Sequence, residues 1–143
     1  MIERDPAFWR PIIEHPDVAP AVRAEDGTDW LPTLLESPLC IPFRGEHGGY
    51  FLVRSDHLGL VWDLHAAFTP EGWGRDTNRT LKRLLSVVDA WDIITVLEVA
   101  GNARSRPPIS FGFRSAAEQR DRFRTWFLTR AAWDASPARR RME

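Results

Sequence analysis

Residues 68–75 read Phe-Thr-Pro-Glu-Gly-Trp-Gly-Arg, and this stretch indicates which elements stand on either side of it. Two glycines and a proline within eight residues are typical of a turn between regular elements. A strand is expected before the turn, over residues 58–68. A helix is expected after it, because the apolar residues that follow share one helical face: Leu81, Leu84, Leu85, Val88 and Trp91. The stretch therefore predicts a strand-to-helix turn.

Two helices are expected in the N-terminal part of the chain. Pro6 directly behind Asp5 indicates a helix start, with the Asp5 side chain as its cap. A second amphipathic helix is expected over residues 30–35, capped near Thr28 or Asp29. The stretch between the two helices is expected to be a loop.

The remaining segments predict strands. A glycine-rich connection at residues 45–49 is typical of a hairpin between strands at 40–44 and 50–54. Residues 93–100 are almost continuously apolar, which predicts a strand covered on both faces. Adjacent prolines at 107 and 108 interrupt any helix that follows, and two last strands are expected around residue 113 and over 123–129. This order predicts one α/β domain over residues 1–143, with a mixed sheet.

Composition excludes several classes of protein. Of 143 residues, 43% are hydrophobic and 27% charged, as in ordinary globular domains, so disorder is a poor fit. No apolar run approaches the roughly 20 residues of a membrane-spanning helix, so no membrane association is expected. Cys40 is the single cysteine, which suits a reducing compartment and predicts a cytoplasmic protein. The four histidines show no helical metal-binding pair, so no metal site is expected.

Charge is distributed unevenly along the chain. Acidic residues predominate before the turn and basic residues after it. The two halves can neutralise each other, or the basic half can hold an anionic ligand. The only basic run, residues 139–141, is short, so nucleic-acid binding is unsupported.

Three side chains are candidates for proton transfer. Alternation along residues 59–68 places Asp63 and His65 on one face of a strand, and Leu60, Trp62, Leu64 and Phe68 on the other. A histidine can accept a proton from an amine near neutral pH, and Asp63 is near enough to influence it. Glu98, on the next strand, is a second base or an anchor for a cationic amine. The same residues could instead form a buried polar network between two strands.

The element order resembles the GNAT superfamily of acyl-CoA-dependent N-acetyltransferases over nearly the whole chain. The turn at 68–75, Asn102 after the next strand and the triplet at 111–113 carry the resemblance. It implies a mostly antiparallel sheet of about six to seven strands with helices on both faces. It also implies that the strands expected over residues 58–68 and 93–100 separate near residues 65 and 99, leaving room for acetyl-CoA.

This resemblance implies an N-acyltransferase that moves an acetyl group from acetyl-CoA to a primary amine on a small molecule or peptide. The residues implied to hold the cofactor are Phe68, Thr69, Gly72, Trp73, Gly74, Arg75, Arg79 and Asn102. The pattern is altered at Asp76 and Asn78, where the family has glycines. The Asp76 carboxylate is expected to cap the donors of its own helix. Ile109 stands where many members carry a tyrosine acid.

The chain also looks similar to acetyltransferase-like proteins of tailed bacteriophages. That resemblance implies an alternative: a catalytically silent structural or assembly protein, working as a homo-oligomer or within a larger assembly. In that case the protein would be associated with a virion.

Overall fold

The computed structural model describes residues 1–99, 102–116 and 123–142. Within these residues the strands form one six-stranded sheet in the order β1-β2-β3-β4-β6-β5. β3 and β4 run parallel, whereas β1–β2, β4–β6 and β5–β6 run antiparallel. The mixed, mostly antiparallel α/β architecture is therefore confirmed. The strands are β1 (Cys40–Arg44), β2 (Gly48–Arg54), β3 (Val61–Phe68), β4 (Ile93–Val99), β5 (Arg114–Ser115) and β6 (Phe123–Thr129).

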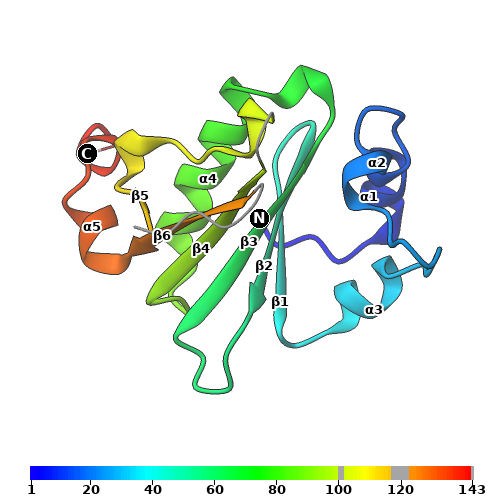
Figure 1. The fold of residues 1–143 in the computed structure, drawn as a ribbon, viewed down its shortest axis with the longest axis horizontal. Coiled ribbons are helices and arrows are strands. Elements are labelled where there is room, and N and C mark those ends of the chain that lie inside the picture. Colours follow the sequence, from blue (N-terminus) through cyan, green and yellow to red (C-terminus); the bar gives the residue numbers. More distant parts are fainter. Residues whose placement is uncertain (100–101, 117–122, 143) are drawn as a thin grey trace. The chain divides into compact units, whose positions relative to one another are not determined.

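Helices lie before, between and after these strands (Figure 1). The α-helices are α1 (Pro6–Ile13), α2 (Ala19–Val22), α3 (Leu31–Glu36), α4 (Arg75–Val87), α5 (Arg130–Asp134) and α6 (Pro137–Arg140). Three short 3-10 helices are η1 (Pro70–Gly72), η2 (Ala103–Ser105) and η3 (Ile109–Phe111). None of the described helices is both long enough and apolar enough to span a membrane.

The chain divides into two compact units. Unit 1 comprises Met1–Val53 and His65–Leu84, and unit 2 comprises Arg54–Leu64 and Leu85–Glu143. Both β3 and α4 begin in one unit and end in the other. The single domain predicted for residues 1–143 stays a prediction.

Of the helices α1, α2 and α3 in unit 1, α1 alone begins with a side-chain cap. The Asp5 carboxylate accepts a hydrogen bond from the Ala7 N–H at 2.9 Å, so the predicted cap of α1 is confirmed. The predicted cap of α3 is wrong, because Trp30 occupies the N-cap position. Asp29, the residue before Trp30, binds the Arg10 guanidinium at 2.9 and 3.1 Å. The short helix α2 lies where a loop was expected.

The core of unit 1 brings α1 and α3 together with β1 and β2. Figure 1 shows α1, α2 and α3 grouped beside β1. Trp9 is fully buried and packs on Phe51, with the ring centroids 4.4 Å apart. The core cluster comprises Trp9, Ile12, Ile13, Val18, Leu31, Leu35, Cys40, Phe51 and Ala67. Burial of this much apolar surface holds the β1–β2 hairpin, which positions the turn described below.

In unit 2 the prediction that residues 93–100 are covered on both faces is wrong for the described part. Ile94 is buried, but Leu97 and Val99 are 52% and 37% exposed. The apolar run therefore misled the prediction, because one face of β4 carries exposed apolar side chains. The expected interruption near Pro107 is confirmed: η2 and η3 are separate short helices.

The C-terminal helices of unit 2 were not predicted. The Ser136 hydroxyl caps α6 by accepting from the Arg139 N–H at 3.1 Å. Arg130 stands 3.8 Å from the Trp91 ring centroid and donates to the Trp91 carbonyl at 2.7 Å. A half-buried cation-π contact of this kind fixes the segment after α4.

Candidate functional site

The turn before α4 is built on the β1–β2 connection of unit 1. The Thr69 N–H and hydroxyl both donate to the His47 carbonyl, at 3.0 and 3.2 Å. Gly72 is buried, and a Cβ there would come within 3.0 Å of His47 and Phe68. Trp73 packs on Phe68 with ring centroids 5.9 Å apart. The predicted cofactor residues Phe68, Thr69, Gly72 and Trp73 are therefore brought together in a packed turn.

Gly74 and Arg75 stand at the exposed end of the turn. Gly74 has φ +98°, a conformation that favours glycine, and nothing lies within 4 Å of where its Cβ would be. Its N–H donates to the Thr77 hydroxyl at 3.0 Å, which closes the first turn of α4. Arg75 is exposed. The helix therefore begins with an open glycine beside an arginine.

Asp76 does not cap its own helix, and this expectation is wrong. Its carboxylate accepts from the Glu46 N–H at 3.1 Å, from the His47 N–H at 2.7 Å and from the Thr80 hydroxyl at 3.2 Å. Helical side chains lean toward the N-terminus, which brings this carboxylate to the β1–β2 turn. Gly45 permits the approach, because a Cβ there would lie 2.7 Å from the carboxylate.

The predicted alternation along β3 holds from Trp62 to His65 and fails at Ala66, which is exposed like His65. Trp62 and Leu64 are buried, whereas His65 is exposed. The Asp63 carboxylate accepts a hydrogen bond from the Thr95 hydroxyl across the parallel β3–β4 pair in unit 2. The expected alternation fails at Leu60, which precedes β3 and is 44% exposed.

The described β3–β4 pairing joins Val61–Asp63 to Ile93–Thr95. His65 belongs to unit 1 and Val99 to unit 2. The separation of the strands near residues 65 and 99 stays a prediction.

Glu98 is held by side chains of unit 2. Its carboxylate accepts from the Trp126 indole N–H at 2.9 Å and lies 3.3 Å from the Arg106 guanidinium and 3.9 Å from that of Arg124. The Glu98 side chain is only 17% exposed. These contacts match the alternative interpretation, a polar network between strands, better than a free base.

Asn102 performs a local structural task. Its side-chain oxygen accepts from the Arg104 N–H at 3.1 Å, and its carbonyl accepts from the Ser105 hydroxyl at 2.7 Å. Both hydrogen bonds join Asn102 to residues of η2, the helix that follows it. Asn102 lies in unit 2, whereas the predicted cofactor residues from Phe68 to Arg79 lie in unit 1.

Tyr50, the single tyrosine, is not placed to act as an acid. Its hydroxyl donates to the Thr77 carbonyl at 3.2 Å, and the side chain is buried. Burial raises the pKa of this phenol, and the nearby Asp76 charge raises the pKa further.

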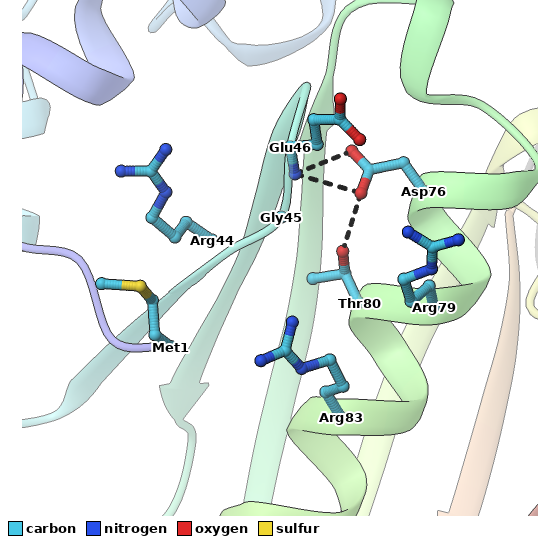
Figure 2. Close-up of a pocket in the computed structure, with 8 residues that line it drawn as sticks. All are labelled: Met1, Arg44, Gly45, Glu46, Asp76, Arg79, Thr80 and Arg83. Carbon is cyan, nitrogen blue, oxygen red and sulfur yellow. Dashed lines mark hydrogen bonds between the residues drawn. The ribbon is translucent and has the colours of Figure 1, made fainter. Parts of the chain in front are cut away.

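A pocket in unit 1 joins residues that the sequence did not connect. Its volume is about 280 Å³, and Figure 2 shows Arg44 on one side with Arg79 and Arg83 on α4 on the other. The four-residue spacing of Arg79 and Arg83 on a helix was visible in the sequence. Arg44 was not predicted, because only the folded hairpin brings it here. The lining residues are Met1, Arg44, Gly45, Glu46, Asp76, Arg79, Thr80 and Arg83.

Within residues 1–99, 102–116 and 123–142, no group of three or more histidine, cysteine or acidic side chains is arranged to hold a metal ion. Comparison of the chain with protein-family models, with curated proteins and with solved structures finds no match in any of the three.

Proposed function

We propose that the protein is an N-acyltransferase that binds acetyl-CoA at the turn before α4 and acetylates a primary amine. The observation that carries this proposal is Gly74. Its left-handed backbone and open surroundings leave the start of a thirteen-residue helix accessible beside Arg75. A helix start of this kind attracts phosphate groups, because its N–H groups carry partial positive charge.

The turn has the features that a pyrophosphate requires. The Asp76 carboxylate is directed to the N–H groups of Glu46 and His47, so its charge is compensated within the hairpin. Arg75 is exposed and can supply a guanidinium to a phosphate oxygen. We assign phosphate binding to Gly74 and Arg75.

His65 is the proposed general base. It lies in unit 1 and its side chain is exposed, so an amine can reach it. Acetyl-CoA supplies the acyl group as a thioester, whose carbon–sulfur bond breaks as the amide bond forms. His65 takes the proton that the amine loses. Glu98 is not assigned this role, because Trp126 and two arginines hold its carboxylate.

Two measurements on each variant test the proposal. We expect calorimetry to show heat when acetyl-CoA is added, and thiol release when amines are supplied. Arg75→Gln should weaken CoA binding about tenfold. His65→Gln should lower kcat about 100-fold and leave CoA binding unchanged. Substitution of Gly74 is avoided, because its positive φ would strain any other residue.

Arg140→Gln is the matched control, because Arg140 is exposed and lies on α6. The absence of both heat with acetyl-CoA and thiol release with small-molecule and peptide amines would rule out the acyltransferase.

A second candidate is a catalytically silent assembly protein, working as a homo-oligomer or as part of a bacteriophage particle. The engagement of both predicted carboxylates, Asp63 with Thr95 and Glu98 with Trp126, favours it. Mass photometry distinguishes this role, which predicts species larger than a monomer. A strictly monomeric protein that releases thiol from acetyl-CoA would eliminate it.

A further inference from the structure

The pocket on unit 1 lies apart from Gly74 and Arg75, to which phosphate binding is assigned above, although it is lined by Arg79, which the resemblance counted among the cofactor residues. Gly74 and Arg75 do not line it, and its walls are the end of β1, the β1–β2 turn and one side of α4. Arg44 comes from β1, and Arg79 and Arg83 lie one helical turn apart on α4 (Figure 2). Three arginines from two elements therefore line one hollow.

Arg44 is fixed by its neighbours. Its guanidinium donates to the Glu3 carboxylate at 2.9 Å and stands 3.9 Å from the centroid of the Phe8 ring. These contacts hold the side chain at the edge of the pocket. Glu3 compensates part of its charge, so Arg44 contributes mainly to the local positive potential.

Arg79 and Arg83 are differently placed. Both are exposed, and among the residues that the structure describes neither has a hydrogen-bond or ion-pair partner. Like charges four residues apart on a helix repel and lower its stability. A bound anion would remove this repulsion.

The acidic residues in the pocket wall do not cancel this charge. Asp76 is 8% exposed, and its carboxylate accepts hydrogen bonds from two backbone N–H groups and from the Thr80 hydroxyl. The Glu46 side chain is 72% exposed and lies 3.8 Å from the His47 ring nitrogen. Burial lowers the pKa of the Met1 amino group, and the charges of Arg83 and Arg44 lower it further.

We propose that this pocket binds the phosphate group of a small phosphorylated molecule through the guanidinium groups of Arg79 and Arg83. Guanidinium groups present paired N–H donors that match phosphate oxygens. The volume of about 280 Å³ is at the low end for ligand pockets, which fits a phosphorylated sugar better than a whole CoA molecule. The site is independent of the proposed acyltransferase function.

Calorimetric titration of the full chain with glucose 6-phosphate and with inorganic phosphate tests the site at low and high salt. We expect both probes to bind, with sulfate competing. Arg83→Gln should weaken binding about tenfold, because it removes charge-assisted hydrogen bonds. Arg140→Gln carries the same change of charge on α6 and should bind as the unmodified protein does. Circular dichroism confirms that each variant is folded.

Three results would overturn the assignment. They are no binding of either probe, equal weakening by Arg83→Gln and Arg140→Gln, or weakening by Arg75→Gln alone. The last would put the phosphate at the turn and leave the pocket without a role. Binding of a single-stranded oligonucleotide much tighter than glucose 6-phosphate would also reject a small-molecule site. Because Arg83 is not part of the proposed CoA site, loss of CoA binding and loss of sugar-phosphate binding are separable.

Discussion

In unit 1 the carboxylate of Asp76 is held by backbone N–H groups, whereas in unit 2 the carboxylate of Glu98 is held by side chains. Backbone donors in a packed turn cannot rotate away when their acceptor is removed. The Arg106 side chain, at 51% exposed, can turn into water instead. We infer that Asp76 fixes the local fold, while Glu98 adjusts to its surroundings at low cost.

The largest effect is expected for Asp76→Ala. It leaves the Glu46 and His47 N–H groups without their acceptor and should lower the free energy of unfolding by about 3 kcal/mol. Asp76→Asn keeps one acceptor oxygen and should cost about half as much. Urea unfolding measures both. A loss below about 0.5 kcal/mol for Asp76→Ala would remove the proposed difference between the units.

Gly45→Ala tests the same contact from the other side. The added Cβ would meet Thr80 and would lie 2.7 Å from the Asp76 carboxylate, so the hairpin and α4 must move apart. We expect a loss of about 2 kcal/mol in the free energy of unfolding. Gly27→Ala shows what backbone strain without a steric clash costs, because Gly27 has φ +79° and nothing within 4 Å, whereas the φ of Gly45 is not positive. A loss below about 0.5 kcal/mol for Gly45→Ala would show that the hairpin and α4 accommodate the added Cβ.

Cys40 extends the comparison from carboxylates to a buried thiol. Burial raises the pKa of the Cys40 thiol to about 11 from its ordinary value of 9.0, and the charge of Arg4 opposes this change. Because the folded pKa is higher, the stability that Cys40 contributes is complete below pH 9. It is lost between pH 9 and 11, as the unfolded thiol ionises first.

The expected difference between pH 8 and pH 11 is about 1 to 2 kcal/mol. Urea unfolding of the unmodified protein and of Cys40→Ala at both pH values isolates it. Native Cys40 should also react slowly with a thiol reagent at pH 8. Equal pH dependence in the two proteins would show that burial of the thiol has no such effect.

Glu98→Gln should have the smallest effect. The amide oxygen can still accept from the Trp126 indole N–H, and only the ion pairs with Arg106 and Arg124 are lost. We expect a change below about 1 kcal/mol and a small shift of the Trp126 indole resonance in NMR spectra. A loss of stability as large as that of Asp76→Ala would mean that side-chain donors lose as much as backbone donors when their acceptor is changed.

Local patterns predicted much of the fold. The Asp5–Pro6 cap, the β1–β2 hairpin and the helix after Gly74 depend on neighbours in sequence, and all three are present. The cap of α3 was missed because the contact of Asp29 with Arg10 spans 19 residues. A side chain that is expected to cap a helix can bind a distant residue instead, and the local sequence does not indicate this.

The candidate site was predicted less well for the same reason. The places of Gly74 and Arg75 at the start of α4 could be predicted, because a glycine-rich turn before a helix is a local pattern. The partners of Asp76 and the position of Arg44 depend on how the β1–β2 turn meets α4. No pattern of residue spacing along the chain predicts the contact between the β1–β2 turn and α4.

Tyr50 is a natural spectroscopic label for the packing of α4 on the β1–β2 hairpin. It is the only tyrosine in the sequence, and its ring stands edge-on to Phe68 with centroids 5.1 Å apart. The Tyr50 hydroxyl donates to the Thr77 carbonyl in the first turn of α4, so isotope-labelled tyrosine would give one set of ring signals that reports whether this end of the helix is packed on β2. Undocking of that helix end could then be followed in the unmodified protein.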